Sequence, residues 1–185
     1  CMFSNCSALT DLNVSKFDTS KVKGMYLMFK DVPASIIDVS NWDTNNVTDM
    51  SYMFYGSDDL SNINLSGFKT NNVTDMSSLF SSVGANVDSF TILGLSSWNV
   101  SNVNSMANMF SNTAVNATSF SIGDLSNWNT QNVTSMKNMF NNAGKNASWS
   151  LDCSKWDVSK ITNATNYKGF NSNVTTKVKA PIWVS

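Results

Sequence analysis

Residues 39–54 read VSNWDTNNVTDMSYMF, and this block returns along nearly the whole chain. Close copies are LSGFKTNNVTDMSSLF at 65–80, LSSWNVSNVNSMANMF at 95–110 and LSNWNTQNVTSMKNMF at 125–140. A looser copy occupies 14–29, and a degraded one begins at Cys153. Six copies of one pattern in 185 residues exclude a chance match, so the chain is a repeat protein.

One aromatic residue in each copy measures the repeat length. It falls at Phe17, Trp42, Phe68, Trp98, Trp128 and Trp156, which gives spacings of 25, 26, 30, 30 and 28 residues. A single unit of this length cannot bury its apolar face alone, so neighbouring units must stack. We expect stacked copies over 1–170, near 1–29, 30–54, 55–80, 81–110, 111–140 and 141–170, and then a C-terminal cap strand over 171–185.

Two spacings within each copy predict its local structure. An L-x-x-L-x-L pattern precedes the block, for example at Phe90, Leu93 and Leu95, and its period of two predicts a short strand. The V-x-x-M-x-x-M-F spacing that follows suits a tight helical or 3₁₀ turn. The fold class that we expect is an α/β repeat, a leucine-rich-repeat-like right-handed solenoid of about six turns of 25–30 residues. Short parallel strands would line its concave face, and short helical or 3₁₀ turns its convex side.

The core of such a fold should consist of columns of like residues. The ten methionines fall in the columns of the repeat, which favours adaptable core filling over metal binding. We expect the Trp column to be buried as well. The same burial is expected for the threonine file at Thr19, Thr44, Thr70 and Thr130.

The composition excludes several classes of function. The chain contains no His, Arg or Glu, and its net charge is −1. Without Arg, and with so little net charge, nucleic-acid binding is not expected. General acid-base catalysis has few residue types to draw on, and no nucleophile motif is present, so the chain is not predicted to be an enzyme and no cofactor is expected. No apolar run reaches about 18 residues, so this segment is not expected to insert into a membrane.

The candidate ligand-binding residues lie at the outward position of each strand and at the serine that follows. The outward file is Asn13, Asp38, Asn64, Gly94, Asp124 and Asp152, and the serines with it include Ser40, Ser66, Ser96 and Ser126. Two interpretations stay open. The side chains could hydrogen-bond the local backbone where the strand ends, as could the residue after each aromatic. Alternatively they form a polar ligand surface on the concave face. Calcium sites are disfavoured, because Gly94 and Asn64 interrupt the carboxylates, and no metal ligand set is predicted.

The block resembles a known family at this level of detail. Trp42-Asp43-Thr44, Val47-Thr48-Asp49-Met50 and Met53-Phe54, with their equivalents in the other copies, are similar to the BspA-like leucine-rich repeat surface proteins. The VTxMxxMF block is similar to that of the branch known from mycoplasma-type surface lipoproteins. The resemblance covers nearly the whole chain. It implies a surface-exposed and often adhesive protein, without a defined ligand or a catalytic set.

The leading hypothesis is therefore an extracellular binding or adhesion module at the cell surface. Its expected partner is a protein or glycan on a host or neighbouring cell. The first alternative is a structural scaffold or filament, which would self-associate through an uncapped N-terminal edge. The second alternative is ice binding through the threonine file.

Overall fold

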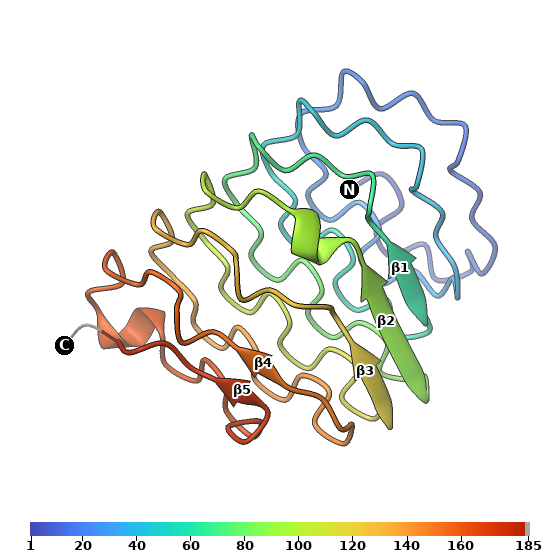
Figure 1. Ribbon diagram of the computed structural model, residues 1–185. Helices are drawn as coiled ribbons and strands as arrows, with labels where there is room; N and C mark the ends of the chain where they lie inside the picture. Colours follow the sequence, from blue (N-terminus) through green and yellow to red (C-terminus); the bar gives the residue numbers. More distant parts are fainter. Residues whose placement is uncertain (184–185) are drawn as a thin grey trace.

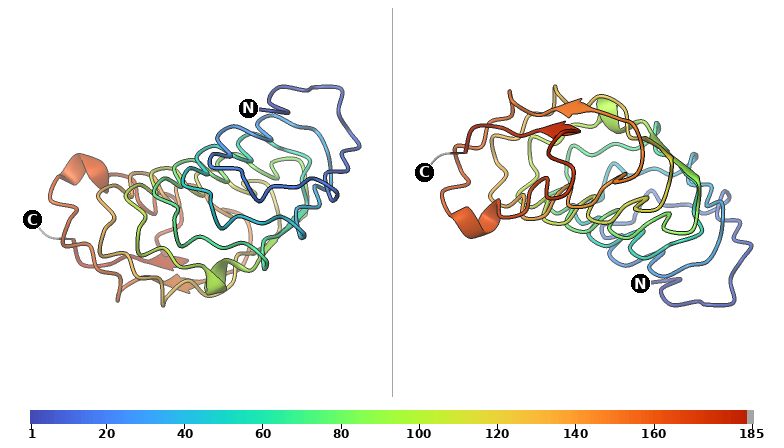
Figure 2. Two further views of the ribbon diagram at one scale, coloured as in Figure 1. Left: turned by 90° about the horizontal axis from the view of Figure 1, so that it is seen from above. Right: turned by 90° about the horizontal axis from the view of Figure 1, so that it is seen from below.

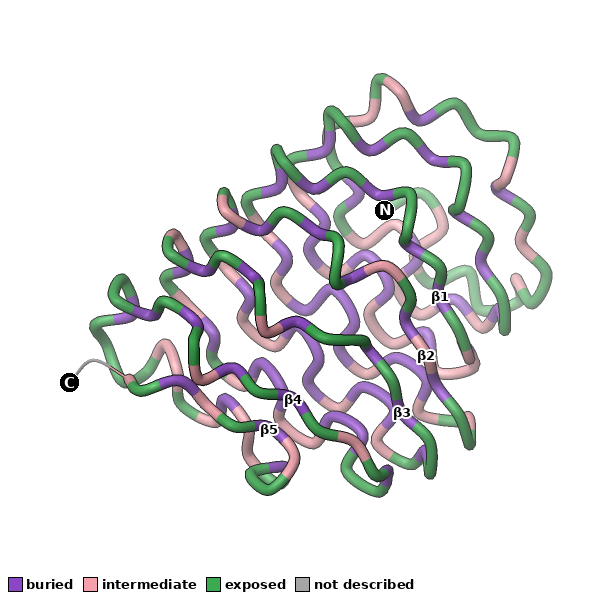
Figure 3. Tube along the Cα trace, viewed as in Figure 1, coloured by how far each residue is buried: buried purple, intermediate pink, exposed green. Residues whose placement is uncertain are grey.

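Successive repeats of the chain lie side by side along the molecule (Figure 1). The computed structural model describes residues 1–183. The two ends of the chain lie at opposite ends of the stack, as Figure 2 shows from two further sides. Buried and exposed residues alternate along each turn of chain (Figure 3), so every repeat contributes to one shared interior.

One wall of the molecule, which we call the strand wall, carries the strands. They are β1 (Asn62–Asn64), β2 (Ser89–Leu93), β3 (Ser119–Ser121), β4 (Leu151–Asp152) and β5 (Val178–Lys179). All pairs are parallel, and they form two separate sheets with the orders β1-β2-β3 and β4-β5. The strand wall is therefore interrupted between β3 and β4. Strand β5 lies within the cap predicted over 171–185, of which residues 184 and 185 lie outside the described part.

The expected inward residue of β2 is wrong by one position. Ile92 is the buried residue, at 1% exposure, whereas Leu93 is 52% exposed. Gly94 is an extra residue in the left-handed region, with φ 96°, which restores Leu95 to the core. A Cβ atom on Gly94 would lie 2.4 Å from the backbone nitrogen of Ser66, so only glycine fits there. The Leu-x-Leu pattern predicted the wrong inward residue, because strict alternation of inward and outward residues assumes a strand without a bulge.

The opposite wall holds neighbouring turns together without strands. Single parallel bridges connect Gly24, Asp49, Asp75, Ser105 and Ser135 in succession. We call the segments that follow these bridges, 24–31, 49–56, 75–82, 105–112 and 135–142, the Met ladder. Within it every second N–H donates to a carbonyl of the next turn, as Met50 does to Asp75 at 3.0 Å. The ladder therefore joins five consecutive turns without a gap.

The Met ladder contains no helix, which differs from the expected helical or 3₁₀ turns. Its intermediate N–H groups do bond three residues back, as Met53 does to Met50 at 3.3 Å. However, Leu27, Tyr52 and Ser78 have φ values of 54°, 56° and 53°. A right-handed helix cannot continue through such left-handed residues, so each turn ends after one hydrogen bond. The 3₁₀ helices are instead η1 (Leu95–Ser97) and η2 (Ala164–Asn166).

The interior consists of columns of like side chains, as expected. In the Phe column the ring centroids of consecutive members lie 5.3 to 5.8 Å apart and the rings are nearly parallel. The members with no exposed area are Phe29, Phe54, Phe80, Phe110 and Phe140. Full burial of one such side chain contributes about 1.5–3 kcal/mol to folding. The column is therefore a main source of stability.

The Trp column is buried too, which confirms that expectation. Trp42, Trp98, Trp128 and Trp156 are between 3% and 5% exposed. The indole N–H of Trp128 donates to the Leu95 carbonyl of the preceding turn at 2.9 Å, and those of Trp42 and Trp156 make the same bond. Trp98 departs from this pattern, because its Nε1 has no partner within residues 1–183.

The threonine file is also buried. The hydroxyl of Thr44 donates to the Lys69 carbonyl of the next turn at 3.1 Å, and that of Thr70 to the Asn99 carbonyl at 2.9 Å. Thr19 and Thr130 make equivalent bonds. These hydroxyls hold turns together, and they are not presented to a ligand.

Candidate binding surface

The Asn and Asp residues predicted to point outward lie at the ends of strand segments, and we call them the strand-end file. The sixth predicted residue, Gly94, has no side chain and precedes η1. Each Oδ1 atom accepts a hydrogen bond from the N–H of the serine two residues on. The pairs are Asn13 and Ser15, Asp38 and Ser40, Asn64 and Ser66, Asp124 and Ser126, and Asp152 and Ser154, at 2.8 to 3.1 Å. The interpretation of this file as local backbone hydrogen bonding is thus confirmed. All five side chains nevertheless remain exposed to solvent.

The predicted serines take part in the same turns. The Ser40 hydroxyl donates to the Asp38 carboxylate at 2.7 Å, and Ser66 and Ser126 provide the backbone N–H. Ser96 differs, because it lies in η1 behind Gly94 and has no Asx residue before it. The strand-end file is therefore interrupted at the fourth repeat, where the exposed Leu93 side chain takes its place.

The Asx turns fix the charge of the file. Hydrogen bonds from the Ser40 hydroxyl and backbone N–H lower the pKa of Asp38. The backbone N–H and hydroxyl of Ser126 lower that of Asp124. The pKa of Asp152 falls to about 2 through the Ser154 hydroxyl, the Ser154 N–H and Lys179. All three carboxylates are therefore ionised at any physiological pH.

The Asp and Asn residues that follow the column aromatics form a second set of turns, also as one interpretation expected, whereas Lys69, which follows Phe68, cannot accept such a bond. Asp18, Asp43 and Asn99 accept from the N–H two residues on, at 2.9 to 3.0 Å. Asp157 does the same with Ser159 at 2.9 Å. These turns provide a set of exposed polar residues that lies away from the strand ends.

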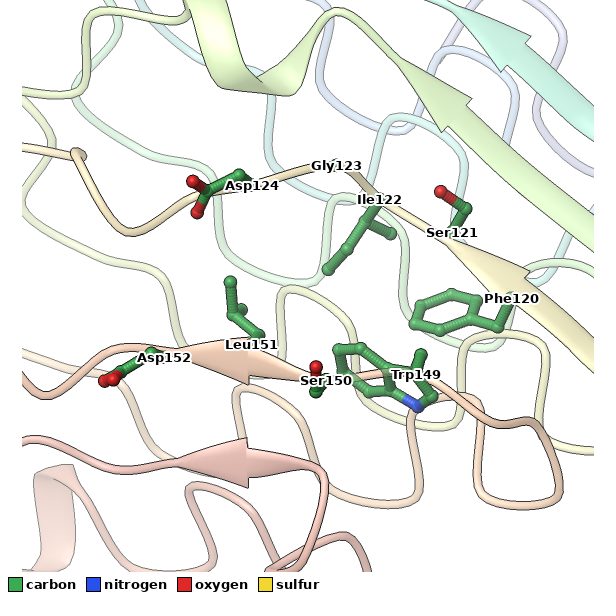
Figure 4. A pocket seen from close by; sticks show the side chains of 9 residues that line it. All are labelled: Phe120, Ser121, Ile122, Gly123, Asp124, Trp149, Ser150, Leu151 and Asp152. Atoms are coloured by element: carbon green, nitrogen blue, oxygen red, sulfur yellow. The ribbon is translucent and has the colours of Figure 1, made fainter.

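A slot opens where the strand wall is interrupted, between β3 and β4 (Figure 4), and it has a volume of about 310 Å³. Asp124 and Asp152 of the strand-end file lie at one end of it, and Phe120 and Trp149 lie at the other. Ile122 and Leu151, which are 3% and 6% exposed, form its floor. The strand-end prediction thus found the two carboxylates but missed the aromatic and apolar parts of the slot.

The opening coincides with a difference in chain length between the two copies that flank it. From Phe110 to Ile122 the chain advances 12 residues, but from Phe140 to the equivalent Leu151 it advances only 11. The preceding connection carries Thr118, whose N–H and hydroxyl both bond the Asp88 carbonyl of the neighbouring turn. The shorter connection makes no such bond within the described residues. A second residue is missing after Leu151, because Gly123 separates Ile122 from Asp124 whereas Leu151 directly precedes Asp152. The drop in aromatic spacing from 30 to 28 residues is the sequence feature that accompanies the slot.

The slot does not provide a nucleophile or a metal site. Cys153 is adjacent, but burial, followed by the charges of Asp152 and Asp124, raises the pKa of its thiol. A thiol with a raised pKa is a poor nucleophile. Over residues 1–183 no group of three or more His, Cys, Asp or Glu side chains is placed to hold a metal ion. The chemistry that the slot offers is recognition through carboxylates, hydroxyls, main-chain groups and aromatic rings.

The repeats carry a family signature. The family model described as a Mycoplasma protein of unknown function, DUF285, matches residues 1–113 and again residues 85–180. The chain belongs to this family. The two matches overlap over 85–113, about the length of one repeat, as expected when one model is laid twice along an array. No curated protein and no solved structure matches the chain. Within the described residues, no helix has the length and apolarity needed to cross a membrane.

Proposed function

We propose that this chain is an extracellular binding or adhesion module that acts through the strand-end file. The observation that carries the proposal is a row of exposed polar side chains held in fixed positions by their own turns. Asp38 accepts hydrogen bonds from both the N–H and the hydroxyl of Ser40, and Asp124 and Asp152 accept from the N–H groups of Ser126 and Ser154. A partner that binds them does not have to order them first, so less entropy is lost on binding.

The exposed apolar residue in the same file supports the proposal. Leu93 is 52% exposed and lies where the other repeats carry Asn or Asp. A large exposed apolar side chain among polar neighbours is a typical anchor for a protein partner. The partner class we propose is a protein or glycan on the surface of a host or neighbouring cell, and the leucine-rich-repeat-like solenoid is the architecture that would present the file to it.

The test is a binding screen by surface plasmon resonance against extracellular matrix proteins and immobilised glycans. The double variant Asp124→Lys with Asp152→Lys should lose about tenfold or more of the affinity for any partner found, because two attractions become repulsions. The matched control is Asp18→Lys with Asp43→Lys, which removes two equivalent Asx turns outside the file. Equal losses in both double variants would refute the strand-end file as the binding surface.

The scaffold alternative is weakened by the packing at the C-terminal end of the stack. There the rings of Tyr167 and Trp183 stack with centroids 4.6 Å apart, and Trp183 also packs against Phe170. A second copy stacked on this end would have to displace Trp183. We expect a concentration-independent monomer mass in light scattering.

A further inference from the structure

The edges of β3 and β4 that face the slot have no partner strand. Each is the outer strand of its sheet on that side. In the paired parts of the strand wall, inward residues bond toward the next turn, as Leu65 does to the Leu93 carbonyl at 3.0 Å. By the same alternation, the main-chain groups of Ile122 and Ser150 face the slot from its two sides. Neither residue makes a main-chain hydrogen bond within residues 1–183.

The slot is closed at one end. Beyond Asp124 and Asp152, the indole N–H of Trp156 bonds the Leu125 carbonyl at 3.0 Å, as in other repeats. The two turns are therefore held together there and open only along their strands. A volume of about 310 Å³ lies at the lower end of the range of about 300–1,000 Å³ that is usual for ligand pockets. The size suits a few residues of extended chain.

Strand β5 shows how an extended segment pairs with the opposite edge of β4. On the far side of β4, β5 pairs in parallel through the bonds of Leu151 to Lys177 at 2.8 Å and of Cys153 to Lys179 at 2.9 Å. The Lys179 ammonium contacts the Asp152 carboxylate at 3.1 Å. The segment that pairs with this edge of β4 is thus an extended strand, and its lysine contacts a carboxylate of the strand-end file.

We propose that the slot between β3 and β4 binds an extended, lysine-bearing peptide segment of a partner protein, which pairs with the free edge of β3 by main-chain hydrogen bonds. Asp124 receives the lysine ammonium, as Asp152 receives that of Lys179. The aromatic end, formed by Phe120 and Trp149, accepts an apolar side chain. Addition of a strand to an exposed edge is a recurrent mode of peptide recognition, in which main-chain bonds provide affinity and side-chain pockets provide specificity. This inference deepens the proposed binding function and relies on it only for the existence of a natural partner.

The direct test uses a fluorescein-labelled, end-blocked peptide with the sequence Val-Thr-Val-Lys-Val, measured by fluorescence anisotropy with the full chain. Asp124→Asn keeps the Asx turn, since Asn13 and Asn64 form the same turn in other repeats. This variant should bind the peptide about two- to fivefold more weakly, as expected for one exposed ion pair. Asp38→Asn is the matched control, with the same change outside the slot, and it should leave the dissociation constant unchanged.

Main-chain pairing is tested separately from charge. Methylation of the peptide nitrogens that face β3 should abolish binding, whereas methylation of the alternate nitrogens should be tolerated. In NMR spectra, the amide signals of Ile122 and Ser150 should shift on binding. The absence of binding at millimolar peptide, equal sensitivity to both methylation patterns, or equal effects of the two Asn variants would each overturn the proposal.

Failure of this inference can be told apart from failure of the proposed function. If a matrix protein binds the strand-end file but the peptide does not compete with it, the slot assignment is wrong and the binding function stands. If the peptide binds as described but no surface partner is bound by the chain, the adhesion function is wrong and the slot assignment stands.

Discussion

The Met ladder and the strand wall are built from the same repeats but differ in how neighbouring turns are joined. In the ladder, bridges run without a gap from Gly24 to Ser135. In the strand wall, the described strands form two sheets with an interruption between β3 and β4. The strand-end side chains bond their own turn, whereas the ladder backbone bonds the next turn.

This difference indicates how the molecule separates stability from recognition. Hydrogen bonds between turns, together with the Phe and Trp columns, fix the stack from one side. The strand wall can then tolerate an extra residue at Gly94 and a missing residue before Trp149 without loss of the core. Changes that support binding are therefore expected on the strand wall, and changes in the ladder are expected to destabilise the fold.

The largest effect that we expect from a test of the difference between the two walls is in the Phe column. Phe80 has no exposed area and lies 5.8 and 5.5 Å from Phe54 and Phe110, measured between ring centroids. Phe80→Ala should lower the free energy of unfolding by about 3–5 kcal/mol, because it leaves a cavity in the middle of the column. Urea unfolding followed by circular dichroism measures this change.

The matched change on the strand wall is Leu93→Ala. Because Leu93 is 52% exposed, its truncation should change the free energy of unfolding by less than about 0.5 kcal/mol. Comparable losses at Phe80 and Leu93 would show that the two walls contribute equally to stability and would remove the basis of the comparison.

The left-handed residues of the ladder provide the next largest effect. Ser82 has φ 57°, and its N–H bonds the Ser111 carbonyl of the next turn at 2.8 Å. Ser82→Val should cost about 1–2 kcal/mol, since a β-branched residue is strained in this region. Ser82→Asn should be tolerated, because Asn112 and Asn142 occupy the equivalent positions and bond each other at 2.8 Å. Thermal unfolding of both variants tests the ladder geometry, and a benign Val substitution would contradict it.

The Trp column offers a matched pair with a smaller expected difference. The Nε1 of Trp128 is bonded, whereas that of Trp98 has no partner in the described chain. Trp128→Phe should therefore cost about 1 kcal/mol more than Trp98→Phe, because only Trp128 loses a hydrogen bond. Phe68 already occupies this column and stacks on Trp98 with centroids 6.4 Å apart. Equal costs in urea unfolding would show that the indole bonds between turns contribute little.

The sequence predicted the columns and the strand-end file because both repeat in register. Trp128 and Asp124 recur at a fixed distance from each other in their own and other copies, so their environment could be inferred from the pattern. The spacing of Met136 and Met139 was also correct as a sign of burial, but it could not distinguish a helical turn from a turn broken by a left-handed residue at Asn138. A helical turn and a turn broken by a left-handed residue would both place Met136 and Met139 in the core.

The slot could not be predicted from the repeat, because it arises where the repeat fails. The buried residues Ile122 and Leu151 are of the same apolar type as their counterparts in other copies, so residue type alone does not mark the slot. Relative to the preceding copy, one residue is missing between Phe140 and Leu151 and a second between Leu151 and Asp152, and the strand pairing is interrupted at this place. Length differences between copies were expected to affect only loops, yet here one of them coincides with an interruption of the strand wall.

The smallest effect that we expect concerns the pKa of a single carboxylate on the strand wall, that of Asp152. The pKa of Asp152 is lowered to about 2, and the largest single cause is the Ser154 hydroxyl within the same turn. Lys179 of the next segment lowers it through a hydrogen bond and through its charge, each a smaller effect than that of the hydroxyl. Ser154→Ala should therefore raise the pKa of Asp152 more than Lys179→Ala does, in an NMR titration of the side-chain carboxyl carbon. Since the folded pKa lies below the unfolded value of about 3.9, the stability from this group is present above pH 4 and is lost as the pH falls toward 2. Asp157, whose turn with Ser159 is untouched, should keep its lowered pKa in both variants. A larger shift in Lys179→Ala would mean that contacts between segments, and not local turns, set the charge of the strand wall, as they set the structure of the ladder.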